Sequence, residues 1–477
     1  MSGQAPLNAV TIVTIPYEGE IVCEGADDYE MSFEERRPKV LNVCRAYWAD
    51  ANHELTRVEP GRKHTGGLYY PVDITHDNGA SFEEFVLYLP LHVDSTAGNA
   101  AILKAMARVE EIESLVPRVI YVDITNDNPL NYPYMLQKRI PGRLLSDIFD
   151  DLPQEQKVLV AAELGRTYRR IQSVRGNFSG IYDIVDDEDI DNEGINQALP
   201  PTKLMPFGMI QEGCEDDLNW NEVRESIKEG DDREKGQVLT RSNLLEDAPN
   251  MTAREILLLM FERWIQRNRH WRGRDFENEC LERALEIVWE LVDKEANAHV
   301  FSTSAACDIC LNNPDVEAPQ NFLVDLDGEG RPVITGIMEW DGVELVPHFV
   351  GCMPPDGLWT FGPAEEDYLD DEEEEDDDDY DFDMPDHEPL DTELPHNAAG
   401  AEVKRAFDEA VGAAFRAAAY SPDMVFAHRY FAFAACQGWQ GCDFIGIEEL
   451  AEEWYNRNLL TSQPEEGGMV MRKKKKM

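Results

Sequence analysis

The chain has 477 residues, a formal net charge of −52 and 43% hydrophobic residues. This length exceeds one usual hydrophobic core, so we expect two lobes plus extensions. The negative charge argues against partners such as nucleic acid or an anionic membrane, because their phosphate groups would repel the protein. No apolar run approaches the ~20 residues of a membrane-spanning helix, and the N-terminus lacks a signal-peptide pattern. The composition therefore predicts a soluble intracellular protein, in the cytoplasm or the nucleus.

The nine cysteines are scattered, and their odd number suits a reducing compartment. Cys307 and Cys310 form a lone CDIC motif. A zinc site would need a second pair of ligands at a suitable spacing, and a redox motif would need a thioredoxin-like setting. Neither accompanies the motif, so we expect ordinary buried thiols and no metal there.

The first part of the chain predicts a small α+β lobe. Residues 1–65 show no clear period and are expected to form an irregular N-terminal extension. Residues 67–93 contain two extended runs joined by HDNG, which is a hairpin signal. A helical pattern follows at residues 98–115, and two more strands lead to a break at Pro141-Gly142. We therefore predict a small N-lobe at residues 66–140 and a hinge at Gln137–Gly142.

Beyond the hinge, residues 141–477 predict a larger, mainly helical C-lobe. The pattern at 251–268 opens with Thr252 followed by Glu255 three residues later, which is typical of a helix-capping box. An acidic stretch interrupted by proline and glycine predicts a loop-rich insertion. Helical patterns occur at residues 153–174, 251–268, 277–295, 399–420 and 446–460, and the insertion covers residues 181–250.

Two charged segments interrupt or end this lobe. Residues 365–388 contain seventeen acidic residues and no Lys or Arg, so residues 364–392 are predicted to be a disordered acidic insert that could take a basic partner. The basic tail at residues 472–477 is also expected to be mobile. Three interpretations of the tail stay open: a nuclear-import or anion-binding patch, a loose contact with the acidic insert, or a solvated tail without a specific role.

The segment at residues 312–351 carries the strongest functional signal. Asp315 is followed by Asn321, an apolar strand, the turn LDGEG, a second apolar strand and then Glu339. A hairpin of these two strands would bring Asn321 and Glu339 to the same end. Taken singly, Asp315 is common in turns, Asn321 could cap a strand, and Glu339 could be a surface acid.

Three phrases in this order resemble the aminoglycoside phosphotransferase and choline kinase-like family, and its eukaryotic members in particular. They are SLVPRVIYVDITNDNPLNYPYMLQKRIPGRLL, NPDVEAPQNFLVD and GRPVITGIMEWDGVELVPHFVG, and the resemblance extends over about residues 65–460. It implies a two-lobed protein-kinase-like α+β fold and ATP-dependent phosphoryl transfer, with Mg²⁺, to a hydroxyl group of a small molecule.

The resemblance assigns roles to individual residues. Asp315 corresponds to the catalytic base, and Asn321 and Glu339 correspond to the metal ligands, with Asp341 as a further carboxylate nearby. Nucleotide binding falls to the hinge, where Gln137 and Arg139 stand.

Several of the family's residues are changed in this chain. Asn313 replaces the histidine of the catalytic loop. Asn321 stands six positions after Asp315, where the family has its asparagine five positions after the aspartate. Glu339 replaces an aspartate. Tyr88 or Leu89 stands where the family has a basic residue on the third strand, and the following helix has no acid before Glu110.

Three hypotheses follow from these observations. The chain is a small-molecule phosphotransferase, a kinase-like binding or scaffold module without catalysis, or a structural protein whose acidic arms are its working part. The degraded set of residues favours loss or reduction of kinase activity.

Overall fold

In the computed structural model, contacts divide the chain into two compact units, which are treated separately. The first consists of residues 1–206, 309–372 and 393–416, and the second of residues 207–308, 373–392 and 417–477. The predictions for the acidic insert at residues 364–392 and for the basic tail lie outside the described residues. The structure describes residues 33–48, 53–58, 62–64, 67–76, 81–90, 95–176, 179–184, 202–206, 252–271, 275–301, 309–317, 319–340, 342–359, 395, 397–435 and 441–462.

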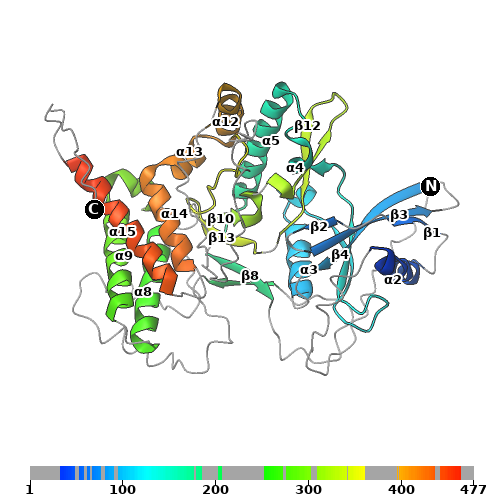
Figure 1. Cartoon of the computed structure of the whole chain (residues 1–477), viewed down its shortest axis with the longest axis horizontal. Helices are drawn as coiled ribbons and strands as arrows, with labels where there is room; N and C mark the ends of the chain where they lie inside the picture. The colour runs from blue at the N-terminus through cyan, green and yellow to red at the C-terminus, as the bar shows by residue number, and fades with distance from the viewer. Residues whose placement is uncertain are drawn as a thin grey trace, which may run out of the picture. The chain divides into compact units, whose positions relative to one another are not determined.

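The first unit begins with a six-stranded antiparallel sheet in the order β1-β3-β4-β6-β5, with β2 paired to β3 (Figure 1). The predicted hairpin is confirmed, since β3 and β4 pair without a shift from Gly67↔Pro90 to His76↔Ser81. The strands are β1 His53–Val58, β2 Arg62–His64, β3 Gly67–His76, β4 Ser81–Pro90, β5 Val119–Asp123 and β6 Tyr134–Lys138.

The helix α2, Phe33–Tyr47, covers one face of this sheet, where an irregular extension was expected. Its buried residues Val40, Val43 and Cys44 share one apolar cluster with alternate residues of β3 and β4. Pro38 within the helix and charged residues around it obscure the helical period in the sequence. The helix α3, Ser95–Met106, contacts β5 and β6 and also the strands β8 and β9 of a second sheet.

Two smaller antiparallel sheets follow in the same unit. One has the order β10-β13-β8-β9 and the other β12-β11-β7, and they carry the segment with the functional signal. β8 and β9 give regular structure to parts of the predicted insertion. The strands are β7 Arg143–Leu144, β8 Gly180–Ile184, β9 Thr202–Pro206, β10 Ile309–Asn312, β11 Phe322–Leu326, β12 Pro332–Ile337 and β13 Glu344–Pro347.

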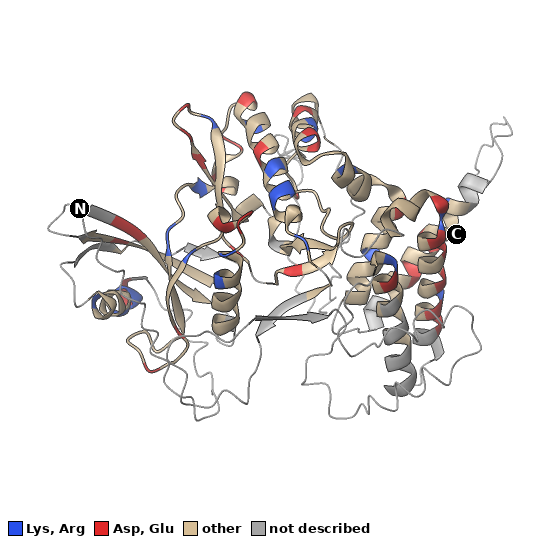
Figure 2. Cartoon of the chain, turned by 180° about the vertical axis from the view of Figure 1, so that it is seen from behind, with Lys and Arg blue, Asp and Glu red and all other residues tan. Residues whose placement is uncertain are grey.

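The helix α5, Gln154–Ser173, lies beside α12, Ala398–Val411, and is preceded by the short helix α4, Leu145–Ile148. Acidic and basic residues both occur along this helix (Figure 2), whereas Leu164, Tyr168 and Ile171 are buried. Gly165 permits the close approach, because a Cβ there would lie 2.7 Å from the carbonyl oxygen of Phe407. This pair of helices forms the support behind the loop described below.

The second unit contains the helices α8 Ala253–Trp271, α9 Asp275–Asp293, α10 Ala298–Phe301, α14 Pro422–Ala435 and α15 Gly441–Ser462. The helix α13, Ala413–Tyr420, runs across the boundary between the units. The predicted capping box is confirmed, since Thr252 N–H donates to Glu255 Oε2 at 2.8 Å and Glu255 N–H donates to Thr252 Oγ1 at 3.2 Å.

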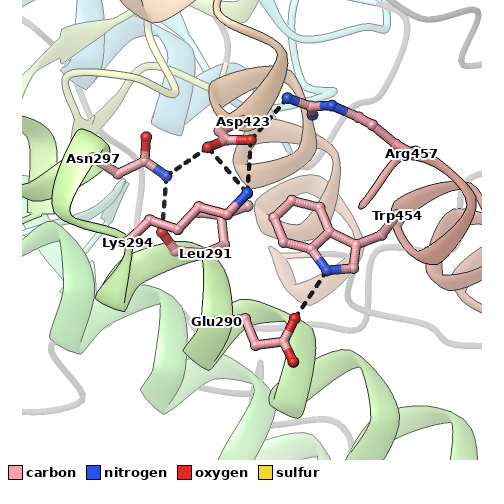
Figure 3. A network of polar contacts seen from close by, with 7 residues as sticks. All are labelled: Glu290, Leu291, Lys294, Asn297, Asp423, Trp454 and Arg457. Atoms are coloured by element: carbon pink, nitrogen blue, oxygen red, sulfur yellow. Dashed lines mark hydrogen bonds and ion pairs between the residues drawn. The ribbon is translucent and has the colours of Figure 1, made fainter. Parts of the chain in front are cut away.

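A polar network centred on Asp423 joins three helical segments of the second unit (Figure 3). Its carboxylate contacts Lys294 Nζ at 3.2 Å and Arg457 Nη2 at 2.9 Å, and it accepts a bond from Asn297 at 3.0 Å. Lys294 Nζ also lies 4.1 Å from the centre of the Trp454 ring. The network therefore links the ends of α9, α14 and α15.

A small antiparallel sheet followed by a mainly helical chain confirms the predicted α+β class. Within the described residues, no helix combines the length and the apolar content that crossing a membrane would require.

Candidate active site

The hairpin predicted between Asn321 and Glu339 is confirmed. β11 and β12 pair antiparallel from Phe322↔Ile337 to Leu326↔Pro332, with one irregularity after Leu323. The turn is closed by Asp327, whose carboxylate accepts bonds from the backbone N–H of Glu329 and Arg331. The open end of the hairpin therefore lies at the predicted metal residues.

Asn321 and Glu339 come together at this open end. Met338 N–H donates to the carbonyl oxygen of Asn321 at 2.8 Å, so the pairing extends one residue beyond the strands and places Glu339 next to Asn321. Both side chains are buried, with exposed fractions of 2% for Asn321 and 6% for Glu339. A buried amide oxygen and a buried carboxylate are hard oxygen donors of the kind that Mg²⁺ prefers.

Two short 3₁₀ turns accommodate the extra residue between Asp315 and Asn321. The first is η5, Pro314–Glu317, and the second is η6, Pro319–Asn321, which delivers Asn321 to the start of β11. The longer spacing is thus compatible with the hairpin position of Asn321.

Asn313 braces the loop in the position that the resemblance gives to a histidine. Its side chain is fully buried, and its Nδ2–H donates to the carbonyl oxygen of Glu339 at 2.8 Å. The replacement of histidine by asparagine therefore keeps a side-chain bond between the loop and the segment of Glu339. A Cβ on Gly342 would lie 3.6 Å from Pro314 Cγ, which shows a second approach of the same two segments.

The main chain of Asp315 lies within η5, directly after Asn313 and Pro314, which make these two contacts. Val316 N–H donates to the carbonyl oxygen of Asn313 at 3.1 Å, and the hydroxyl of Tyr168 donates to the carbonyl oxygen of Val316 at 2.6 Å. The side chain of Asp315 and the whole of Asp341 lie outside the described residues. The structure brings the main chain of Asp315, Asn321 and Glu339 together, and their sharing of one cation stays a prediction.

The two predicted hinge residues belong to the end of the first sheet. Gln137 is buried in β6, where it pairs with Val86 on one side and Val119 on the other. Arg139 is held on Glu84, with an Nη1–Oε1 distance of 3.2 Å and a backbone bond of 3.1 Å. Their role in nucleotide binding stays a prediction.

Of the two residues that the resemblance offers for the position of the missing base, Tyr88 and Leu89, Tyr88 is the one that does not face α2. Leu89 belongs to the cluster beneath α2, so Tyr88 faces the opposite side of the sheet. Its ring centre lies 4.7 Å from that of Tyr69, and a Cβ on Gly67 would lie 2.7 Å from Tyr88 Cε2. An aromatic pair packed against Gly67 therefore stands where the resemblance places a phosphate-binding cation.

A polar pair lies at the base of the loop and was not predicted. Asn312 and Glu344 are opposite one another in β10 and β13, and Asn312 Nδ2–H donates to Glu344 Oε1 at 2.9 Å. Burial raises the pKa of Glu344 to about 7, although the bond from Asn312 opposes the shift. The contact follows from the pairing register of β10 and β13. The sequence alone does not predict it, because it does not show which strand lies beside β10.

A buried thiol, that of Cys310, lies in β10, and the imidazole of His348 directly follows β13. Burial raises the pKa of Cys310 to about 12, so its thiol is protonated and unreactive at neutral pH. Burial, with a smaller contribution from Arg175, lowers the pKa of His348 to about 4, which makes its ring neutral. Cys307 of the CDIC motif lies outside the described residues.

The described part of the chain contains no group of three or more His, Cys, Asp or Glu side chains that could hold a metal ion. Asn321 and Glu339 would supply two protein ligands, and Mg²⁺ in nucleotide sites is commonly held by one or two carboxylates together with phosphate oxygens and water. The donor set therefore fits a magnesium ion that arrives with a nucleotide.

No family model matches the chain, and no curated protein matches it. Among solved structures, the GDP and kanamycin complex of APH(2")-IIia is 12% identical, with a TM-score of 0.35, and the match covers 85% of this chain and 95% of that one. ADP-bound aminoglycoside phosphotransferase APH(2'')-Ib is 12% identical, with a TM-score of 0.35, and the match covers 90% of this chain and 97% of that one. Plasmodium vivax ethanolamine kinase is 10% identical, with a TM-score of 0.36, and the match covers 92% of this chain and 95% of that one.

The chain is thus similar to aminoglycoside phosphotransferases and an ethanolamine kinase, the group that the sequence motifs resemble. Both the identities and the TM-scores of these matches are low.

Proposed function

We propose that this chain binds a magnesium–nucleotide complex and transfers a phosphoryl group from ATP to a hydroxyl group of a small molecule. The observation that carries the proposal is the bond from Asn313 to the carbonyl oxygen of Glu339. Together with the pairing of Asn321 and Met338, it holds the main chain of Asn321 and Glu339 at the open end of one hairpin, and both side chains are buried.

Each residue has one role in this proposal. Asn321 and Glu339 would hold the magnesium ion, with Asp341 as a further carboxylate. The bound ion supplies positive charge that neutralises the phosphate oxygens. Asp315 accepts the proton of the acceptor hydroxyl.

Two further features define the ligands of this site. The nucleotide base is proposed to bind at the hinge, which contains Gln137 and Arg139. The net charge of −52 favours a neutral or cationic acceptor over an anionic one, because the field of the protein attracts cations. Small amino alcohols and aminoglycosides are therefore the first acceptors to assay.

The packing of Tyr88 favours a second candidate function. Phosphoryl transfer normally needs a basic side chain on the phosphates, and β4 has Tyr88 packed on Tyr69 and Gly67 at the corresponding position. A site with metal ligands and no such base suits a nucleotide-binding module without transfer, in which the protein acts as a scaffold or sensor.

Binding and transfer can be measured separately. Thermal unfolding of the full chain is followed with Mg²⁺ and ATP, with ATP and EDTA, and with neither. Ligand at one hundred times its Kd raises the free energy of unfolding by about 2.7 kcal/mol. Glu339→Gln should abolish the magnesium-dependent part of this increase. Glu329→Gln, the same change at an exposed position in the turn of the same hairpin, should leave it intact.

Transfer is then measured with labelled ATP and the amino-alcohol panel. Transfer that depends on Asp315, tested as Asp315→Asn, supports the enzyme. Magnesium-dependent binding without transfer supports the binding module. A chain that millimolar nucleotide does not stabilise in the presence of Mg²⁺ contradicts both functions.

A further inference from the structure

Tyr168 of α5 contacts the candidate loop at two places. Its hydroxyl donates to the carbonyl oxygen of Val316 at 2.6 Å, and its ring is stacked on Phe322 with a centroid distance of 6.3 Å and an interplanar angle of 18°. Val316 directly follows Asp315, and Phe322 directly follows Asn321. One side chain therefore touches the main chain beside the proposed base and the residue beside a proposed metal ligand.

The packing around Tyr168 fixes its ring. Phe407 and Phe415 meet it edge to face, with centroid distances of 5.3 Å and 6.0 Å, and only 2% of Tyr168 is exposed. Such edge-to-face contacts hold a ring in one orientation. Because Phe407 belongs to α12, which lies close to α5 at Gly165, the hydroxyl is presented from a rigid pair of helices.

The hydrogen bond of Tyr168 continues through the loop to Glu339. Tyr168 binds Val316, the N–H of Val316 binds the carbonyl oxygen of Asn313, and the side chain of Asn313 binds the carbonyl oxygen of Glu339. Three successive bonds thus join α5 to the segment of the second metal ligand, and the turn that carries Asp315 lies within them.

We propose that Tyr168 is a positioning residue for the transfer reaction, which holds the Asp315 turn in place relative to Asn321 and Glu339. This inference rests on the proposed function. Tyr168 acts through main-chain and ring contacts and donates no group to the substrate. Its loss should affect the rate of transfer more than nucleotide binding, because a displacement of about 1 Å at a reacting group can cost a hundredfold in rate.

The test compares two tyrosine-to-phenylalanine changes. Tyr168→Phe keeps the ring contacts and removes the bond to Val316. Tyr132→Phe is a matched control just before β6, where the hydroxyl of Tyr132 donates to the carbonyl oxygen of Pro90 at 2.9 Å. Both variants lose one buried hydroxyl–carbonyl bond, so a general loss of stability affects them alike.

Two measurements are made on each full-length variant. The first is the kcat and KM for transfer from Mg–ATP to an amino alcohol or aminoglycoside of the panel or, if none accepts, to water. The second is hydrogen exchange at the amide of Val316. Tyr168→Phe is expected to lower kcat about tenfold to a hundredfold, to leave the KM for Mg–ATP within about twofold, and to speed exchange at Val316. Tyr132→Phe should leave all three within about twofold.

Equal kcat values in the two variants would overturn the inference. A wild-type chain that shows no transfer would overturn the proposed enzyme instead. In that case hydrogen exchange at the amide of Val316 tests whether Tyr168 holds the Asp315 turn. An unchanged exchange rate in Tyr168→Phe would refute this role of Tyr168.

Discussion

Replacing Gly142 by alanine tests how the hinge is joined to the hairpin. Gly142 has a φ of +119°, which side-chain-bearing residues rarely adopt. A Cβ there would also lie 2.8 Å from the carbonyl oxygen of Val324 in β11 and 2.9 Å from Thr335 Oγ1 in β12. Glycine is therefore required for two separate reasons, its conformation and its close approach to the hairpin.

The expected cost can be built from three contributions. The unfavourable φ costs about 1–3 kcal/mol, and forcing an extra methyl against backbone atoms costs about 1–3 kcal/mol. Alanine also reduces the entropy of the unfolded chain, which returns about 0.4–1 kcal/mol. Gly142→Ala should therefore lower the free energy of unfolding of the first unit by about 3 kcal/mol.

Two other glycines separate these contributions. Gly330 has a φ of +76° with nothing within 4 Å of an added Cβ, so Gly330→Ala carries the conformational cost alone, about 1 kcal/mol after the entropy gain. Gly328 has open space and no positive φ, so Gly328→Ala should leave stability unchanged or raise it by up to about 1 kcal/mol.

The assay is native-state hydrogen exchange at amides of β11 and β12, which reports the opening free energy of this part of the first unit. The expected order of destabilisation is Gly142→Ala first, Gly330→Ala second and Gly328→Ala last. If Gly142→Ala costs no more than Gly330→Ala, the close approach to β11 and β12 contributes nothing and the reasoning about the hinge fails.

Two further predictions concern charged groups. Because burial raises the pKa of Glu344 to about 7, the folded protein binds this proton more tightly than the unfolded chain, and the free energy of unfolding should fall by about 2–3 kcal/mol as pH rises from 4.5 through 7. Urea titrations at several pH values should show a smaller fall in Glu344→Gln; equal profiles would contradict the assignment. In the second unit, Asp423→Asn leaves two cations facing each other without their carboxylate and should cost about 2 kcal/mol by chemical denaturation. Asp293→Asn, at a more exposed pair with Arg254, should cost less than about 1 kcal/mol, and similar losses would show that the network around Asp423 adds nothing.

The parts of the fold that the sequence predicted well are those that depend on neighbours along the chain. The hairpin of β3 and β4 follows from two extended runs around one turn, and the start of α8 follows from Thr252 and Glu255. The hairpin that brings Asn321 beside Glu339 is local in the same sense. The helix α2 was not predicted, because charged residues and Pro38 interrupt its pattern of buried positions. The surface on which it packs is also formed by strands that come later in the chain.

The parts of the site that could not be predicted depend on partners distant in the sequence. Tyr168 lies 148 residues before Val316, and its apolar helical spacing indicates only a core residue. The choice between Tyr88 and Leu89 requires knowledge of which face α2 covers. The bond between Asn312 and Glu344 requires the pairing of two strands separated by the whole loop and hairpin.

The changed residues of the motif have different physical consequences, although in the sequence they all suggest loss of function. Asn313 retains a bond to the segment of Glu339, and the two 3₁₀ turns accommodate the longer spacing before Asn321. These changes leave the proposed metal end of the site assembled. Tyr88 is different, because an aromatic ring cannot supply the positive charge that phosphate requires. Under the proposed function, the rate of transfer should therefore be limited by stabilisation of the phosphates and not by metal binding, and restoring a base by Tyr88→Lys is the change most expected to raise it.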